Sequence, residues 1–503
     1  MNMIQDLLQR FYYIPAIIIW LIILIKYRQV LGFKFRALKS ELRPGKVVFL
    51  PLLAIMVVLI TFALVLPFSY DEAFTFTQFT YPGPQQSLFN YPAPNNHVFH
   101  SLLTCITWRI FGFTHSELSV RLPALFFSAF TLYFVFTRYL EGNMYAVLLF
   151  SILYLFSPNI VEFAFQARGY SIQIFCALAS YFFVIDNKTT RNLTFFERLN
   201  IILLISVIGL FTNPAYLYTA SCIYLMFVTI HYRAIKKEFI SFALINVFYG
   251  ITLLLLYTPI IASKGLHTIT TNETVIPVNG FSDRLFAHLK FLVNFLTLPN
   301  PLAWVVIVLF IWNTIKQKLY YNVYLVVIPV ILMCVFKQLP FGRVFLPIGA
   351  ILLVNACMAI TSSKGFIKIT AAPPSLTLQL TAFLLIAASC VLSWFYFDNY
   401  HKKDNLATAY YYKKIRPVIS GYDTVYTKNI NISSDWDLHE ILSASLKLKG
   451  KGIENAIDID RDIKEYNFGS AIILSTERFA DFKVVDSTAD FDGDPVYILD
   501  PKK

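Results

Sequence analysis

Two adjacent acidic residues interrupt an otherwise apolar part of the sequence. Asp71 and Glu72 follow Ser69-Tyr70, directly after an apolar segment that ends near Pro67. Acids at the end of a membrane-spanning helix can simply be solvated charges. A carboxylate that is partly removed from water is a better base, because desolvation raises its pKa, and it can then take a proton from a hydroxyl group. Asp71 is therefore a candidate general base, with Glu72 beside it.

Further polar side chains gather at the ends of other apolar segments. The candidates occur in the stretches 95–97, 162–170 and 337–343, and they are Asn96, His97, Glu162, Gln166, Arg168, Tyr170, Lys337 and Arg343. An arginine suits a phosphate, because its planar guanidinium group donates two hydrogen bonds at a fixed geometry. Transfer of a sugar from a lipid phosphate needs a base for the acceptor and cations for the departing phosphate. The acidic pair and these cations together favour that type of reaction.

The same residues also have structural interpretations. His97 at the start of a helix can be a structural hydrogen-bonding group. Arg168 can form an ion pair with Glu162, or extend its charged end from an apolar surface into water. Arg343 can anchor the helix that begins at Val344. These alternatives stay open at the level of the sequence.

The composition places the chain in a membrane. Of its 503 residues, 57% are hydrophobic and only 14% are charged, whereas soluble domains carry about 25% charged residues. The apolar residues form blocks long enough to cross a bilayer as helices, which takes roughly 20 residues each. We predict an all-α polytopic membrane bundle of about 12 transmembrane helices, at 11–25, 47–66, 118–137, 145–160, 170–185, 199–212, 215–230, 239–261, 302–315, 321–336, 344–360 and 376–397.

The loop charges predict the orientation. The net charge of +12 does not indicate nucleic acid, because the basic residues lie mostly in short loops between apolar blocks. One alternating set of loops carries 18 Lys and Arg, and the other, longer set carries seven. Cytoplasmic loops are the basic ones in membrane proteins. Loop 67–117 and both termini are therefore predicted to lie outside the cytoplasm.

The segment from His97 to Phe113 is predicted to lie along the membrane surface. Its polar residues fall on one helical face and its apolar residues on another, which is typical of an interfacial amphipathic helix. Counting it as a span would invert every later loop. The loop 81–96 before it is rich in Pro, Asn and Gln and indicates a shaped loop.

The chain divides into four predicted regions. Residues 1–46 form an N-terminal membrane helix and a basic cytoplasmic loop, 47–365 a catalytic membrane domain, 366–397 a last membrane helix, and 398–503 a small extracytoplasmic α/β domain. In the last region, strands are predicted at Thr424–Ile430, Ala471–Ser475 and Val496–Leu499, and a helix at Trp436–Leu448.

Five short motifs in residues 47–365 resemble the GT-C type of membrane glycosyltransferase. The likeness is to the branch of protein O-mannosyltransferases and aminoarabinose transferases (glycosyltransferase family 39). The markers occur in the family's order, and they are Tyr70-Asp71-Glu72; Asn96-His97 with Phe111-Gly112; Ser119-Val120-Arg121-Leu122-Pro123-Ala124; Ser157-Pro158 through Ala167-Arg168-Gly169-Tyr170; and Arg343-Val344-Phe345-Leu346-Pro347.

The resemblance implies a GT-C fold with a catalytic cavity under the first external loop. It implies inverting transfer of a monosaccharide from a polyprenyl-phosphate donor to an acceptor hydroxyl. Carried over, Asp71 becomes the general base or the acid that orients the acceptor, and Glu72 becomes its helper. Arg343 contacts the donor phosphate, and Arg168 and His97 line the same cavity.

Other positions are carried over less directly or depart from the family. Lys337 and Tyr70 join the donor side, and Glu162, Gln166, Tyr170 and Asn96 join the acceptor side or the cavity wall. Gln166 stands where relatives often have an acid, and Glu162 lies one helical turn away and could substitute for it. A divalent metal at Asp71 and Glu72 stays open, because two carboxylates without a third ligand are weak evidence.

The expected partners are a lipid-linked sugar, membrane lipids, and a glycan, lipid or protein acceptor. The expected location is a bacterial cytoplasmic membrane, with the active site and the C-terminal domain facing outside. Three alternatives compete with an active transferase: a transporter, a polymerase or ligase of polyprenyl-linked glycans, and an inactive family member that serves as a scaffold through its external domain. A transporter would also have many helices, although transporters tend to place charges near the bilayer midplane and to show repeated halves. A polymerase or ligase of polyprenyl-linked glycans would share the donor chemistry.

Overall fold

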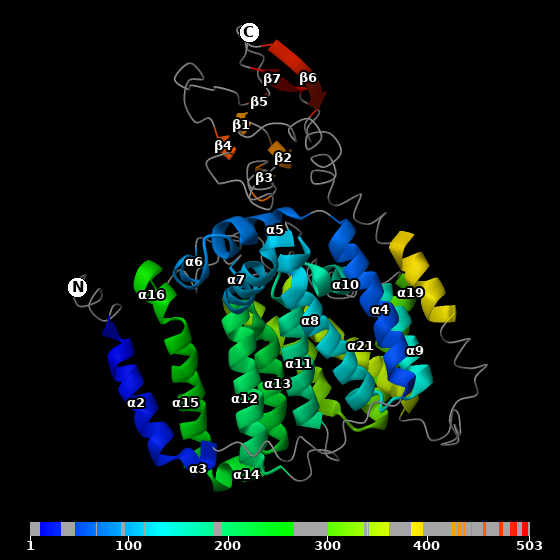
Figure 1. Cartoon of the computed structure of the whole chain (residues 1–503). Helices are drawn as coiled ribbons and strands as arrows, with labels where there is room; N and C mark the ends of the chain where they lie inside the picture. The colour runs from blue at the N-terminus through cyan, green and yellow to red at the C-terminus, as the bar shows by residue number, and fades with distance from the viewer. Residues whose placement is uncertain are drawn as a thin grey trace.

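The structure is a computed structural model that describes about two thirds of the chain. The described residues are 11–31, 46–66, 68–91, 96–114, 117–185, 193–265, 300–336, 340, 342–361, 384–395 and, in the C-terminal region, 425–428, 431–433, 436–437, 444, 456–458, 472–475, 483–489 and 495–500. The helices gather in one bundle, and the strands all come from the C-terminal region (Figure 1).

Five helices in the described residues are long and apolar enough to cross a membrane. They correspond to α4 (Lys46–Val65), α8 with η4 (Leu118–Phe134 and Val135–Tyr139), α12 (Phe195–Thr212), α15 (Phe239–Leu256) and η7 with α21 (Gly342–Phe345 and Leu346–Thr361). The outward faces of α4 and α15 expose large apolar side chains, among them Phe49, Leu53, Ile240 and Leu254. Exposed apolar surface of this extent fits lipid, and the chain is a helical membrane protein.

The remaining predicted spans coincide with shorter apolar helices. These are α2 (Tyr13–Lys26), α11 (Tyr170–Ile185), η5 with α13 (Pro214–Tyr216 and Leu217–Ile230), α19 (Asn300–Lys316), η6 with α20 (Tyr320–Val323 and Tyr324–Phe336) and a helix at Leu384–Phe395. The first eight residues of the predicted span 376–397 lie outside the described residues. The helical class is confirmed, and the number of twelve spans stays a prediction.

Two predicted spans are broken by proline. The span 145–160 is wrong as a single helix, because α9 (Met144–Leu155) ends before Pro158 and α10 (Pro158–Phe165) leaves it at an angle of 84°. The span 239–261 likewise divides into α15 and α16 (Thr258–Lys264), with Pro259 in the first turn of α16. Proline lacks the backbone N–H that a helix interior needs and is tolerated in a first turn, and Pro158 and Pro259 each lie in the first turn of the second helix.

The predicted external loop 67–117 is largely helical in its described residues. It contains α5 (Tyr70–Thr75), η2 (Phe76–Thr80), α6 (Pro84–Phe89), α7 (Val98–Phe111) and η3 (Gly112–Thr114). The predicted amphipathic helix is α7. Its polar face, with His100, Ser101 and Thr104, is buried against the protein, whereas Ile106 and Ile110 are exposed.

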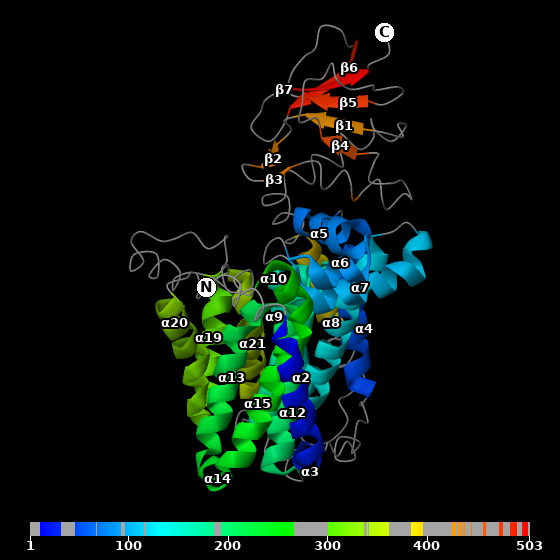
Figure 2. The ribbon, with the colours of Figure 1, turned by 90° about the vertical axis from the view of Figure 1, so that its left-hand side faces the viewer.

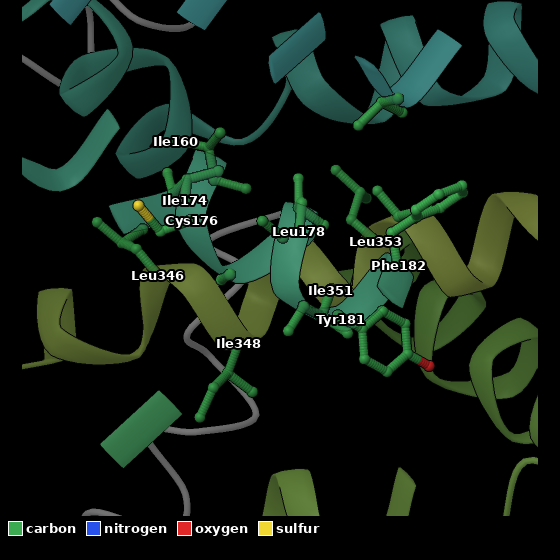
Figure 3. Close-up of a cluster of buried hydrophobic side chains, with 14 of the residues drawn as sticks. Ile160, Ile174, Cys176, Leu178, Tyr181, Phe182, Leu346, Ile348, Ile351 and Leu353 are labelled. Atoms are coloured by element: carbon green, nitrogen blue, oxygen red, sulfur yellow. The ribbon is translucent and has the colours of Figure 1, made fainter. Parts of the chain in front are cut away.

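The packing of α11 against α21 brings two distant segments to the same end of the bundle. Figure 3 shows apolar side chains of the two helices meeting, including Ile174 and Leu178 from α11 and Leu346 and Leu353 from α21. Because Arg168 and Arg343 lie just before these two helices, this core places both arginines close together.

The two ends of the bundle differ in the loops they carry. α5 and α6 lie at one end, and the short helices α3 (Arg28–Leu31) and α14 (Tyr232–Lys237) lie at the other, in both views (Figures 1 and 2). α3 and α14 belong to the basic loops that the sequence assigns to the cytoplasm. Their position opposite α5 agrees with the predicted alternation of loops.

The described part of residues 398–503 contains short strands. β4 (Ala456–Asp458), β1 (Val425–Lys428), β5 (Ile472–Ser475), β7 (Pro495–Asp500) and β6 (Lys483–Ala489) form a sheet in that order, with β1 parallel to β4 and β5, and β7 antiparallel to β5 and β6.

Three of the strands, β1, β5 and β7, fall where they were predicted. The predicted helix Trp436–Leu448 is wrong at its start, because β3 (Trp436–Asp437) pairs with β2 (Asn431–Ser433), and an aromatic residue such as Trp436 suits a strand. Most of the remainder of that stretch lies outside the described residues, so the α/β domain stays a prediction.

Candidate functional site

The first centre of charge is an ion pair buried inside the bundle. Arg121 of α8 donates from Nε and Nη2 to the two carboxylate oxygens of Glu72, at 2.8 and 2.7 Å, and the side chains are 0% and 1% exposed. Its Nη1 donates to the carbonyl oxygens of Ala63 and Leu66, at 2.9 and 2.6 Å. A bidentate pair with these further hydrogen bonds compensates for the removal of both charges from water.

Glu72 also joins two other chain segments. The backbone N–H of Ala167 donates to Glu72 Oε1 at 2.7 Å, which fixes the residue before Arg168. Ser69 and Glu72 form a reciprocal capping box that starts α5. We call Glu72, Arg121, Ser69 and the Ala167 N–H the inner ion-pair centre. It joins the end of α4, the start of α5 and the turn before α11.

The second centre lies next to the first but is less buried. Asp71 Oδ2 lies 2.8 Å from Arg343 Nη1 and 3.4 Å from Arg168 Nη2. The exposed fractions of these side chains are 16% for Asp71, 32% for Arg343 and 1% for Arg168. We call Asp71, Arg168 and Arg343 the outer ion-pair centre. The structure therefore brings together three predicted site residues from three separate segments.

Arg168 is held in place along its length. Its Nη1 lies 3.4 Å from Thr75 Oγ1 and 3.5 Å from the carbonyl oxygen of Asp71. Its guanidinium carbon lies 6.0 Å from the centre of the Tyr170 ring, within the range of a cation–π contact. Arg168 is thus a fixed cation that pairs with Asp71.

His97 accepts a hydrogen bond from the turn that carries Arg168 and holds that turn in position. The N–H of Gly169 donates to His97 Nδ1 at 3.0 Å, and the amide of Asn213 lies 3.2 Å from Nε2. A Cβ atom at Gly169 would lie 2.7 Å from His97 Nδ1 and would also collide with Thr212, so only glycine fits this close approach. His97 therefore has the structural role that was one of its two interpretations.

Burial keeps two histidines of this region neutral. It lowers the pKa of His97 well below the usual range, and the nearby Arg168 acts in the same direction. Burial also lowers the pKa of His100 to about 3, again with a contribution from Arg168. Both ring nitrogens of His100 lack a hydrogen-bond partner among the described residues. The local positive charge therefore comes from arginines.

The other predicted site residues take different positions. Gln166 Nε2 donates to Glu162 Oε1 at 2.6 Å, so these two side chains form a pair on α10 and the turn after it. The Tyr170 ring packs edge-on against His97, with 4.8 Å between the ring centres. Tyr70 is half-buried and packs against Phe74.

Two predicted residues do not join this group in the described structure. Asn96 shapes the loop before α7, because its amide donates to the carbonyl oxygens of Ser87 and Asn90, each at 2.9 Å. Lys337 lies outside the described residues.

The arrangement separates the two acids that could have shared a metal. Glu72 faces Arg121, whereas Asp71 faces Arg343 and Arg168. Within the part of the chain that the structure describes, no group of three or more His, Cys, Asp or Glu side chains is placed to hold a metal ion. The site chemistry that the geometry offers is a carboxylate and two guanidinium groups.

Sequence reasoning did not select Arg121, His100 or Asn213 as site residues. Arg121 could have been selected from the sequence, because burying an arginine inside an apolar helix costs free energy unless the charge is paired. Asn213 precedes Pro214 at the break between two helices, where its side chain caps the next turn by accepting from the Ala215 N–H at 2.9 Å. The only sequence feature that pointed to His100 was its position on the polar face of the helix that forms α7.

No known protein family, curated protein sequence or solved structure matches this chain.

Proposed function

We propose that the chain is a membrane glycosyltransferase that moves a sugar from a polyprenyl-phosphate donor to an acceptor hydroxyl. The observation that carries this proposal is the outer ion-pair centre. It sets one carboxylate against two guanidinium groups at the end of the bundle opposite the basic loops. A base for the acceptor and cations for the departing phosphate are the groups that such a transfer needs.

The proposed reaction is a single displacement. The acceptor oxygen forms a bond to the anomeric carbon of the sugar while the bond from that carbon to the phosphate oxygen breaks. Asp71 takes the proton of the acceptor hydroxyl. The electron pair of the broken bond leaves with the polyprenyl phosphate, whose added negative charge Arg343 and Arg168 stabilise. The configuration at the anomeric carbon is inverted.

The inner ion-pair centre supports the site without joining the chemistry. Glu72 holds α5 through its capping box and holds the turn before Arg168 through the Ala167 N–H. This sets the separation of Asp71 and Arg168. Glu72 and Arg121 are therefore positioning residues in this proposal, and Asp71 is the catalytic residue.

We also propose the more detailed features that the sequence suggests. These are about twelve spans in a GT-C arrangement, a C-terminal extracytoplasmic α/β domain, and a bacterial cytoplasmic membrane with the site facing outside. Helices lie within each predicted span, although 145–160 and 239–261 are each divided between two helices. α3 and α14 lie at the end opposite α5, as loops on alternate sides of a membrane would. The lipid tail of the donor would then stay in the bilayer while its headgroup reaches the arginines.

The test is consumption of donor by purified chain in lipid nanodiscs. A panel of polyprenyl-phosphate sugars would be supplied with candidate acceptors, and the loss of donor and the release of polyprenyl phosphate would be measured. The wild type should consume at least one donor, and Arg343→Ala should consume it at least about 100-fold more slowly. Arg109→Ala, which changes an exposed arginine of α7, is the control and should match the wild type. No consumption by the wild type across the panel would contradict the proposal.

A further inference from the structure

One carboxylate oxygen accepts both arginines in the structure. Asp71 Oδ2 lies 2.8 Å from Arg343 Nη1 and 3.4 Å from Arg168 Nη2. Neighbouring cations stabilise the ionised form of a carboxylate and oppose its protonation. A base must accept a proton during the reaction, so a carboxylate held in this way is not yet ready to act. At least one of the two ion pairs must loosen first.

The two arginines differ in how firmly they are held. Arg168 is 1% exposed, contacts Thr75 and lies against Tyr170. The residues on both sides of it are also fixed, because the Ala167 and Gly169 N–H groups donate to Glu72 and His97. Moving the Arg168 guanidinium group would break its contacts with Thr75 and Tyr170, and the hydrogen bonds on either side hold its backbone in place.

Arg343 is placed to exchange partners. Its side chain is 32% exposed, and it lies in η7, a four-residue 3-10 turn at the start of α21. A guanidinium group has five N–H donors and binds phosphate as readily as carboxylate. A phosphate that approaches from solvent or from the lipid surface therefore meets Arg343 before the buried Arg168.

We propose that Asp71 and Arg343 form a latch that the phosphate of the donor opens. This inference rests on the function proposed above and adds an order of events to it. In the resting site Asp71 Oδ2 is held by Arg343 and Arg168. The donor phosphate takes Arg343 from Asp71, and the carboxylate is then available to the acceptor hydroxyl. The donor must bind before the acceptor can react.

The latch predicts that Asp71 competes with phosphate for Arg343. Removing the carboxylate should therefore strengthen phosphate binding, but only while Arg343 is present. Simple repulsion between Asp71 and a phosphate would also strengthen binding in Asp71→Asn, but that gain would persist without Arg343. A double-mutant cycle separates the two effects, because it isolates the coupling between Asp71 and Arg343.

The experiment measures the affinity of the full-length chain in nanodiscs for a polyprenyl monophosphate, with inorganic phosphate in a parallel arm. The four proteins are the wild type, Asp71→Asn, Arg343→Ala and the double variant. We expect about tenfold tighter binding of the polyprenyl phosphate in Asp71→Asn than in the wild type. Arg343→Ala should bind more weakly, and adding Asp71→Asn to it should change the affinity less than twofold.

The parallel arm identifies the source of the phosphate. Tighter binding confined to the polyprenyl phosphate would identify a lipid headgroup as the ligand that opens the latch. The same gain with inorganic phosphate would show that the latch responds to phosphate without a lipid tail, and would overturn the lipid donor as the specific trigger.

Three outcomes would overturn the proposal, and they differ in what else they affect. An unchanged affinity in Asp71→Asn, or an equal gain with and without Arg343, would remove the latch but leave the donor site intact. No binding of polyprenyl phosphate to either the wild type or Asp71→Asn would remove both the latch and the proposed donor site.

Discussion

The two acids at the start of α5 are neighbours in sequence but lie in opposite environments. Glu72 is 1% exposed, and its carboxylate is held by Arg121, by Ser69 and by the Ala167 N–H. Asp71 is 16% exposed, and one of its two arginines, Arg343, is itself 32% exposed. Successive residues of a helix point about 100° apart, so one turn of α5 sends one acid inward and the next outward.

This difference separates a structural ion pair from an exchangeable one. The inner ion-pair centre is enclosed, so its partners can change only if the fold opens. The outer ion-pair centre reaches the surface through Arg343, so a ligand can compete for its contacts. A membrane protein can therefore use one short acidic motif both to fix a loop and to place a reactive group.

The largest expected effect is on the inner ion-pair centre. Arg121→Ala leaves Glu72 buried without its bidentate partner, and breaking a buried pair in this way typically costs about 3–5 kcal/mol. We expect loss of monodisperse protein or a large fall in thermal stability, measured by size-exclusion chromatography and thermal unfolding in detergent. Arg109→Ala, at an exposed site, is the matched control. Equal stability of Arg121→Ala and Arg109→Ala would show that the inner ion-pair centre does not hold the fold.

The close packing of the turn at Gly169, next to the inner and outer ion-pair centres, can be tested by adding one methyl group. Gly169→Ala places a Cβ atom against Thr212 and His97, and overpacking of this kind typically costs about 1–3 kcal/mol. The change should also displace the neighbouring Arg168. Gly250→Ala in α15 is the control, because a Cβ atom there meets nothing within 4 Å. If thermal unfolding of the two alanine variants is indistinguishable, the close packing of this turn is wrong.

The burial of His100 predicts a dependence of stability on pH. Its pKa is about 3 in the folded protein, against about 6.5 in an unfolded chain. The unfolded state therefore binds more protons below pH 6.5, and stability falls as the pH falls from about 6.5 toward about 3.

At pH 5 this single group should account for about 2 kcal/mol. Thermal unfolding at pH 7 and pH 5 should show a smaller loss in His100→Phe than in the wild type. His97 acts in the same direction and should leave part of the loss in place. An identical pH dependence in the two proteins would mean that His100 is not buried as a neutral group.

The smallest expected effect on stability is at the outer ion-pair centre. Asp71→Asn removes the ion pair with the partly exposed Arg343, and a pair of that kind contributes about 1 kcal/mol or less. It also removes the longer, 3.4 Å pair with the buried Arg168, which keeps its contacts with Thr75 and the Asp71 carbonyl oxygen. The amide keeps the size of the side chain and can still accept a hydrogen bond. We expect a thermal stability close to that of the wild type. A loss as large as that of Arg121→Ala would make Asp71 a structural residue and would remove the distinction between the two centres.

The sequence predicts the helical membrane class and much of the helix placement, because hydrophobic blocks act locally. α2, α4 and α11 lie close to their predicted spans. The breaks at Pro158 and Pro259 were missed because the flanking residues are apolar enough to continue a span on hydropathy alone. Short strands such as β3 were missed because pairing partners decide them more than local composition does.

The site could be predicted only in part. The types of Asp71, Arg168 and Arg343 indicated their chemistry. The packing of α11 against α21 brings the two arginines together, and the hydrogen bond from the Ala167 N–H to Glu72 brings α5 with Asp71 to them. Glu72 is structural and Asp71 is the proposed reactive acid because Arg121 pairs with Glu72. Arg121 lies 49 positions away from Glu72 in the chain. Hydropathy and spacing carry no information on which acid that arginine meets. The capping-box spacing of Ser69 and Glu72 was the one local hint.

The most direct test of the distinction is donor consumption by Asp71→Asn, measured per folded molecule. Protein that elutes as a single species and unfolds near the wild-type temperature would be assayed with a polyprenyl-phosphate sugar that the wild type consumes. Loss of a general base typically slows a reaction by about 10²- to 10⁴-fold, and we expect a loss in that range. Full activity in well-folded Asp71→Asn would contradict the assignment of Asp71 as the reactive carboxylate.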